Sequence, residues 1–205
     1  MQIPYTQPRE PRILKLLKFL LPGVRSYVED LKTVDELTGL YKLRYFNEQL
    51  AVRFAEASSY RANNHRRARI LVPDLSLLFG DLDRFHDFNR NNGQQAGHEA
   101  LSRIGYVIRR NKRVNDVAGR LGGEEIGVLL PYTEYDEAMV AAKRFRQLVE
   151  EEMQGNVTIS FGVATYSPQD TGIVSALELH DLAEKAMISA KDSGRNSVRG
   201  MYDMA

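Results

Sequence analysis

The order of apolar and amphipathic segments constrains the fold of this 205-residue chain more than any other feature. Short apolar runs typical of strands alternate with longer runs in which apolar residues recur at helical spacing. This pattern predicts strands at 75–81, 114–121, 126–131 and 156–166, and helices at 94–110, 134–153 and 178–193. The order is βαββαβ followed by a further helix, which is the ferredoxin-like arrangement of an α+β domain.

Composition allows one ordinary globular core, since 43% of the residues are hydrophobic. Lys and Arg total 28 against 27 for Asp and Glu, so bulk charge gives no reason to expect nucleic acid or an anionic membrane as a partner. The absence of cysteine excludes disulfides, thiol catalysis and thiolate metal sites. No apolar run approaches the ~20 residues that span a bilayer. We therefore expect a cytoplasmic domain.

Residues 1–34 are expected to form an extension that precedes a domain of residues 35–205. Three prolines within residues 1–11 predict a mobile tail. From Ile13 onward apolar residues recur at helical spacing, with an interruption at Pro22-Gly23. This helical segment either packs on its own domain or serves as a stalk for dimerisation or for docking a regulatory protein. The basic segment 60–73 is expected to be a solvated loop, with a contact surface for an acidic partner as the alternative.

The segment Arg120-Leu-Gly-Gly-Glu-Glu-Ile126 predicts a hairpin whose tip can hold a metal ion. Gly122-Gly123 is a strong signal for a two-residue hairpin turn, and glycine lets a ligand lie close to the backbone. Glu124 and Glu125 stand where a bound cation needs oxygen ligands. Two glycines beside two carboxylates therefore indicate a site for a metal and a phosphate group.

A second acidic pair, Asp81-Leu-Asp83, follows the apolar run that ends at Phe79. In a strand Asp81 and Asp83 point to the same face. In the βαββαβ topology the first strand lies beside the third and antiparallel to it. The end of one strand therefore meets the start of the other, and Asp81 is expected next to Glu124 although the two are far apart in the sequence.

The chain resembles the GGDEF-type diguanylate cyclase domains. The resemblance covers residues 35 to about 200 and depends on five blocks in the order and at the spacing of the family. These blocks are Asp35-Glu-Leu-Thr-Gly-Leu40, Asp81-Leu-Asp83-Arg-Phe85 with Asn89, Arg113-Val-Asn-Asp116, Gly122-Gly-Glu-Glu-Ile126 and Lys191-Asp-Ser-Gly-Arg195-Asn196. The resemblance implies a ferredoxin-like core of the nucleotide cyclase type. It also implies that a C2 homodimer condenses two GTP molecules into cyclic di-GMP and releases two pyrophosphates.

The resemblance also assigns roles to individual residues. It implies that Asp81, Glu124 and the Leu82 carbonyl ligate Mg²⁺ or Mn²⁺, and that Glu124 and Glu125 are catalytic, with Glu124 helping to activate the ribose 3′-hydroxyl. The substrate-binding residues that it implies are Phe85, His86, Asn89, His98, Gly122, Gly123, Lys191 and Arg195. Arg113 and Asp116 match the inhibitory site at which members of the family bind cyclic di-GMP.

Several positions depart from the family pattern. His86 replaces the usual lysine, so a group with a pKa near ~10.4 gives way to one near ~6.5 that is mostly neutral at pH 7. His98 replaces an aspartate that reads the guanine edge, and one imidazole cannot accept two guanine N–H bonds as a carboxylate does. Gln94 and Ile126 also replace the family's usual residues, histidine and phenylalanine. Two alternatives follow: a catalytically weak or inactive receptor for cyclic di-GMP, or a cyclase of relaxed base selectivity.

Overall fold

The computed structural model describes residues 33–62, 74–169 and 172–203. The expected tail, the helix interrupted at Pro22-Gly23 and nearly all of the basic segment 60–73 lie outside these residues. The chain divides into two compact units, Met1–Val34 and Asp35–Ala205, and the description that follows concerns the second. Within the described ranges no helix combines the length and the apolar character needed to cross a bilayer.

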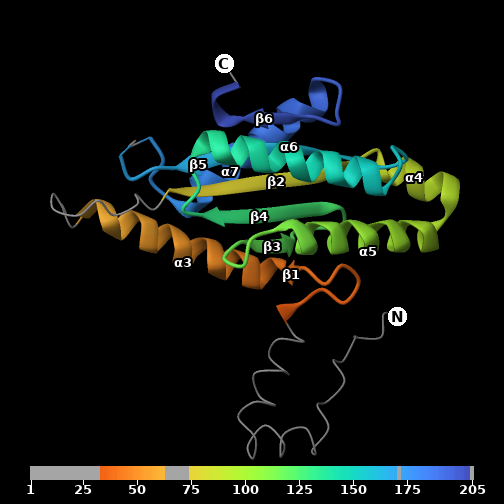
Figure 1. Ribbon diagram of the computed structural model, residues 1–205, viewed down its shortest axis with the longest axis horizontal. Coiled ribbons are helices and arrows are strands. Elements are labelled where there is room, and N and C mark those ends of the chain that lie inside the picture. The colour runs from red at the N-terminus through yellow and green to blue at the C-terminus, as the bar shows by residue number, and fades with distance from the viewer. Residues whose placement is uncertain (1–32, 63–73, 170–171, 204–205) are drawn as a thin grey trace, which may run out of the picture. The chain divides into compact units, whose positions relative to one another are not determined.

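The described part of the second unit contains one six-stranded sheet with the strand order β1-β3-β4-β2-β5-β6 (Figure 1). The β1–β3 and β5–β6 pairs are parallel, and the other three pairs are antiparallel. The strands are β1 (Tyr41–Lys42), β2 (Leu75–Asp83), β3 (Val117–Arg120), β4 (Glu125–Pro131), β5 (Thr158–Tyr166) and β6 (Val198–Gly200). The helices are α3 (Leu43–Ala62), α4 (Phe85–Asn92), α5 (Gln94–Asn111), α6 (Tyr135–Glu152), α7 (Ala176–Asp192) and the 3₁₀ helix η1 (Met201–Asp203).

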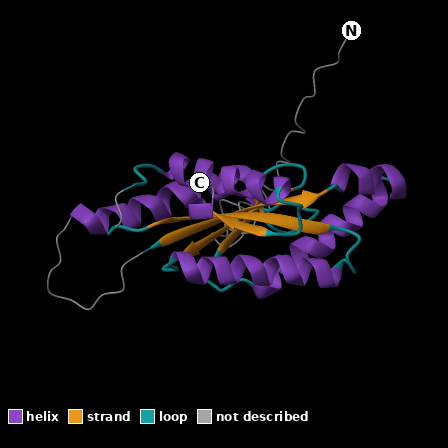
Figure 2. Ribbon diagram, turned by 90° about the horizontal axis from the view of Figure 1, so that it is seen from above, coloured by secondary structure: helices purple, strands orange, loops and turns teal. Residues whose placement is uncertain are grey.

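Helices cover both faces of the sheet, as the view along its edge shows (Figure 2). Successive side chains of β2 point to opposite faces of the sheet, so they contribute to two different hydrophobic cores. Leu78 and Leu82 pack with α5 and α6, whereas Leu77 and Phe79 pack with α3 and α7. The odd-numbered residues of β2 therefore face α3 and α7, and Asp81 continues this row at the end of the strand.

The predicted fold class is confirmed, and all seven predicted elements are present with boundaries within three residues of those expected. The segment α3 was not predicted, because Leu43 and Val52 are exposed and obscure the buried stripe of Phe46, Leu50 and Ala57. The elements β1, α4, β6 and η1 were also missed. They are too short or too polar to show a hydrophobic period.

The expected two-residue turn at Gly122-Gly123 is wrong. The Leu121 N–H donates to the Glu125 carbonyl oxygen at 2.8 Å, so three residues, including Glu124, form the loop between β3 and β4. Neither glycine has a positive φ, which the tight two-residue turns require. A Cβ at residue 122 would lie 2.3 Å from the Glu125 Oε2 atom, so a larger residue there would displace the end of this side chain. At Gly123 a Cβ would meet nothing within 4 Å, so this backbone is open to a ligand.

Candidate active site

The end of β2 and the start of β4 bring two acidic segments of the sequence together. The antiparallel register sets Asp81 opposite Glu125, and the Leu82 N–H donates to the Glu124 carbonyl oxygen at 3.2 Å. Directly opposed residues of two strands project from the same face of the sheet. The structure therefore gathers three acids here, with Glu125 rather than Glu124 directly opposite Asp81. We call Asp81, Glu124 and Glu125 the carboxylate cluster.

Among the residues that the structure describes, Asp81 has one cationic partner. The Lys191 Nζ at the end of α7 donates to Asp81 Oδ1, and the two side chains are 23% and 15% exposed. Burial and, to a smaller extent, the charge of Asp83 raise the pKa of Asp81, and the pKa stays above its ordinary value although the hydrogen bond and charge of Lys191 lower it. One lysine therefore does not compensate this carboxylate.

The hairpin acids show the same excess of negative charge. Burial raises the pKa of Glu124, and the charges of Asp81 and Glu125 raise it further. Burial likewise raises the pKa of Glu125, and the charges of Asp81 and Glu184 raise it further. Lys191 is the cation that acts on all three members of the cluster. A divalent cation with oxygen ligands, such as Mg²⁺ or Mn²⁺, fits this arrangement because it would neutralise the remaining charge.

Asp83 lies on the same strand but has a different environment. Its carboxylate is 7% exposed and accepts hydrogen bonds from Thr158 Oγ1 (2.7 Å), Ser160 Oγ (2.7 Å) and the Asn196 N–H (2.9 Å). These three donors are neutral, and they hold β2 against β5 and the segment after α7. The Asp83 carboxylate is therefore occupied by hydrogen bonds within the protein, whereas Asp81 contacts Lys191.

Hydrogen bonds from Arg120 hold the hairpin loop in place. Its guanidinium donates to the carbonyl oxygens of Gly122 (3.2 Å) and Gly123 (2.7 Å), and its Nη1 lies 3.2 Å from Asp35 Oδ1. Burial alone would raise the pKa of Asp35, but hydrogen bonds from Thr38 and the nearby guanidinium outweigh it and lower the pKa. The turn that opens the domain is thus connected to the glycine pair through one arginine.

A pocket of about 260 Å³ opens between α4, α5 and the hairpin loop. Five residues that the sequence predicted for substrate or metal line it: Phe85, Asn89, His98, Gly123 and Glu124. Gln94, Gly97, Leu101 and Arg120 complete the lining. The open backbone of Gly123 and the Glu124 side chain join the pocket to the carboxylate cluster. A planar ring in the pocket would therefore lie near bound phosphates.

Asn89 carries an unused acceptor inside this pocket. Its Oδ1 atom is buried and has no hydrogen-bond partner in the described part of the chain. A Cβ at residue 97 would lie 1.8 Å from that atom, so Gly97 is required for Asn89 to occupy its position. A buried oxygen without a donor costs free energy, and a ligand N–H would remove that cost.

The other predicted substrate residues lie outside the pocket lining. The His86 side chain is 86% exposed, and its charge is the smallest of the influences that act on the pKa of Glu124. Gly122 packs against Glu125. Lys191 contacts Asp81, and Arg195 is exposed three residues after the end of α7. Of these two cations, the structure places Lys191 at the carboxylate cluster.

A second pocket of about 130 Å³ lies at the opposite end of the β3–β4 hairpin and includes Arg113, Asp116 and Leu130. The Asp116 carboxylate accepts from the Arg113 N–H at 2.7 Å and so fixes the turn before β3. The Arg113 side chain is exposed, and Arg144 of α6 lines the same pocket. The structure thus brings Arg113 and Asp116 together and adds an arginine that the sequence did not indicate.

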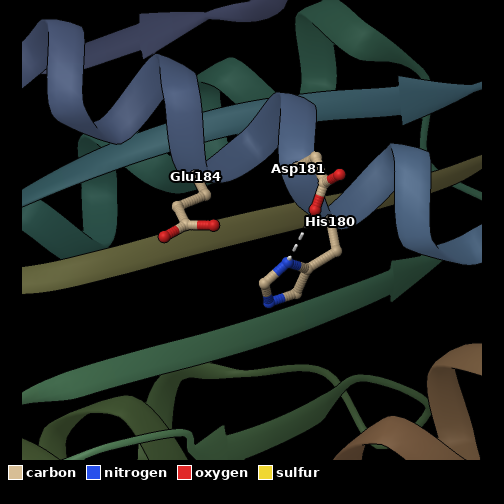
Figure 3. Close-up of side chains that lie close together, drawn as sticks. All are labelled: His180, Asp181 and Glu184. Carbon is tan, nitrogen blue, oxygen red and sulfur yellow. Dashed lines mark ion pairs between the residues drawn. The ribbon is translucent and has the colours of Figure 1, made fainter.

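A further group of titratable side chains lies on α7. His180, Asp181 and Glu184 place one ligand-type atom each within 4.8 Å of one another (Figure 3). His180 Nδ1 lies 3.7 Å from Asp181 Oδ1, and the ring of His180 contacts Phe79 edge to face. Burial and the charge of Asp81 are the largest causes of the raised pKa of Glu125. The charge of Glu184 raises this pKa further, and the charge of His180 lowers it. This group therefore modulates the charge of the cluster from the α7 side.

Sequence reasoning gave no role to Arg120, Gly97 or Arg144. Arg120 precedes the glycine pair directly, and its position could have indicated a contact with that loop. Gly97 interrupts an otherwise helical pattern, which is a sign of close packing. Arg144 stands among several charged residues of α6 and carries no such signal.

Comparison with known proteins agrees with this geometry. Residues 32–197 match the family model described as the GGDEF domain of diguanylate cyclases. The chain is 33% identical over 179 residues to diguanylate cyclase A of Treponema denticola, which covers 84% of this chain and 45% of that protein. It is 34% identical over 181 residues to the response regulator PleD of Caulobacter vibrioides, which covers 83% of this chain and 36% of that protein. The chain thus spans less than half the length of these curated relatives.

Solved structures show the same fold. The GGDEF domain of DgcB from Caulobacter crescentus, solved in complex with c-di-GMP, superimposes with a TM-score of 0.70 at 25% identity. The match covers 83% of this chain and 96% of that one. Because the family model covers most of the chain and the fold agrees, this chain belongs to the GGDEF-domain family of diguanylate cyclases.

Proposed function

We propose that this chain is a metal-dependent nucleotidyltransferase that condenses two GTP molecules into cyclic di-GMP. The observation that carries the proposal is the carboxylate cluster, in which three acids with raised pKa values share one lysine beside a pocket wide enough for a base. Such a cluster is costly for the empty protein. It becomes favourable when a cation and its phosphates complete it.

Asp81 and Glu124 would hold Mg²⁺ or Mn²⁺, together with the Leu82 carbonyl oxygen. The bound cation would neutralise phosphate oxygens and stabilise the charge that develops at the leaving pyrophosphate. Lys191 and Arg195 would contact the triphosphate from the other side. Glu125 lies directly opposite Asp81 and supports the charge balance of the site.

The reaction is a nucleotidyl transfer between two bound nucleotides. The 3′-oxygen of one ribose forms a bond to the α-phosphorus of the other GTP, and the bond from that phosphorus to the bridging oxygen of the β-phosphate breaks. The 3′-hydroxyl proton passes to a base, for which Glu124 is the candidate because burial raises its pKa. Repeating the step closes the ring and releases two pyrophosphates in all. Because the described part of the chain offers one pocket beside the carboxylate cluster, we infer that two chains form a C2 homodimer for the reaction.

Chromatography of the products formed from GTP and Mg²⁺ tests this function. We expect cyclic di-GMP from the wild type and none from Glu124→Ala. The matched control is Glu48→Gln, which changes an exposed acid paired with Arg44 on α3. Equal amounts of product from the wild type and Glu124→Ala would refute the role of Glu124. The absence of product from the wild type would refute the proposed enzymatic activity.

Receptor function is the second candidate, and the observation that favours it is the pocket of Arg113 and Arg144. Two arginines beside a buried aspartate suit a guanine edge or a phosphate of cyclic di-GMP. In the active enzyme the same pocket would mediate product feedback. Binding of cyclic di-GMP by a catalytically silent wild type would favour the receptor.

Base selectivity is a separate question, because the pocket presents His98 and Gln94 where a carboxylate would favour guanine. The Asn89 Oδ1 accepts equally from a guanine or an adenine N–H, and a neutral imidazole serves as donor or acceptor. We expect calorimetric titrations with Mg²⁺ to show GTP and ATP affinities within about 100-fold of each other. His98→Asp should widen the gap in favour of GTP. A gap of several orders of magnitude in the wild type would refute relaxed selectivity.

A further inference from the structure

The segment that follows α7 has an unusual backbone. Gly194, Arg195 and Asn196 have φ values of 112°, 67° and 43°, so three consecutive residues have positive φ. Glycine adopts such values freely, but arginine and asparagine do so at a cost in free energy. A conformation of this kind persists only where surrounding contacts hold it.

Asn196 supplies these contacts. Its backbone N–H donates to Asp83 Oδ2 at 2.9 Å, and its side chain donates to Glu150 Oε1 at 2.7 Å and accepts from Arg146 Nη1 at 2.7 Å. Arg146 also donates to Glu150 Oε2 at 2.6 Å, which closes a triangle of side chains. Both partners lie on α6, far from this segment in the sequence.

Asn196 directly follows a residue whose cationic side chain is not held by such contacts. Arg195 is exposed, and no hydrogen bond or ion pair of its side chain occurs within the described ranges. Asp83, which receives the Asn196 N–H, stands two residues after Asp81 on β2. The Arg195 N–H donates to the Ala190 carbonyl oxygen of α7 at 3.2 Å, and the contacts of Asn196 fix the chain on the other side of Arg195.

We propose that Asn196, held by Arg146 and Glu150, is a positioning residue that directs Arg195 toward the phosphate groups of the nucleotide. This inference depends on the proposed function, because it takes a nucleoside triphosphate as the ligand of the site. Asn196 itself touches no ligand. Its effect is confined to the phosphate end, since Asn196, Arg146 and Glu150 do not line the pocket proposed for the base.

Exchange of the hydrogen-bonding groups provides the test. Asn196→Asp removes the donor to Glu150 and sets two carboxylates against each other, so we expect the Kd for GTP with Mg²⁺ to rise roughly 10-fold, as for the loss of one charge-assisted contact. The Kd for GMP should stay within about twofold, because GMP lacks the outer phosphates. In Asn196→Asp/Glu150→Gln the new amide donates to the new carboxylate, and GTP affinity should return.

Asn156→Asp is the matched control, since it adds the same charge at an exposed asparagine whose side chain bonds only to the nearby Met153 carbonyl oxygen. Equal losses of GTP and GMP affinity in Asn196→Asp would show a merely structural role and overturn the inference. Unchanged GTP affinity, or no recovery in the double variant, would also overturn it. Absence of GTP binding by the wild type would instead show that the proposed function is wrong.

Discussion

The two ends of the β3–β4 hairpin carry different sets of charged side chains. At the tip, the negative charge of Asp81, Glu124 and Glu125 is larger than the positive charge of Lys191 beside them, and the pKa values of the three acids are raised. At the base, Arg113 and Arg144 line a pocket together with Glu137 and Asp116, and the Asp116 carboxylate accepts a hydrogen bond from the Arg113 N–H. The charges at the tip would therefore suit a cation, whereas the two arginines at the base would suit an anion or a polar base edge.

This difference shows how one short hairpin can serve two sites. Metal and triphosphate would meet at the tip, while a cyclic dinucleotide would meet the arginines at the base. The rigid ladder between β3 and β4 separates the two ligands by the length of β4. Changes at one end should therefore alter one kind of binding and spare the other.

The largest effect is expected for Asp81→Asn, which removes a metal ligand from the tip. We expect kcat for pyrophosphate release from GTP to fall roughly 10³-fold, because the loss of metal-assisted charge stabilisation costs several kcal/mol. Cyclic di-GMP affinity at the base should not change. The control is Asp87→Asn, an exposed acid paired with Arg90. A fall of less than tenfold would contradict the assignment of Asp81.

Asp83→Ala should act on stability. It leaves the buried Ser160 hydroxyl and the donors of Thr158 and Asn196 without their acceptor, so we expect a loss of about 2–4 kcal/mol in the free energy of unfolding. Urea denaturation measures this change. A loss below about 1 kcal/mol would mean that Asp83 is not the structural member of the pair.

Arg113→Ala tests the base of the hairpin. We expect the Kd for cyclic di-GMP to rise about 10- to 100-fold, the cost of one bidentate contact to a base or phosphate. Turnover at low product concentration should persist. The control Arg110→Ala removes an exposed arginine that lies over Tyr106 and does not line the pocket. Equal cyclic di-GMP affinity in Arg113→Ala and the wild type would exclude this site.

The smallest effect is the pH dependence of stability. The pKa values of Asp81 and Glu124 are raised above their ordinary 3.8 and 4.5, so the folded state binds these protons more tightly than the unfolded chain. Metal-free protein should therefore lose stability as the pH rises through the window above those ordinary values. Mg²⁺ at about 100 times its Kd should add about 2.7 kcal/mol, a few degrees in Tm, at pH 7.5 and less at pH 5. An equal Mg²⁺ effect at both pH values would contradict raised pKa values in the cluster.

Much of the site could be predicted from the sequence because its groups stand at strand ends whose order follows from the periodicity. The meeting of Asp81 with the hairpin acids required only the antiparallel pairing of β2 and β4. Periodicity alone could not distinguish Asp81 from Asp83, since both project from the same face. The resemblance to the family favoured Asp81, and the donors on β5 and after α7 give Asp83 its different environment. The position of Arg144 and the hydrogen bonds that join Asn196, Arg146 and Glu150 could not be predicted from the sequence, because they depend on how α6 packs rather than on any local pattern.

The most direct test is to measure Mn²⁺ binding by electron paramagnetic resonance in the presence of a non-reactive GTP analogue, because it reports whether the hairpin tip binds a cation. We predict that the wild type and the exposed control Asp87→Asn bind Mn²⁺ with the same affinity, while Asp81→Asn and Glu124→Gln each bind it more than about tenfold less tightly. Equal Mn²⁺ affinity in all four proteins would show that the cluster does not hold the metal.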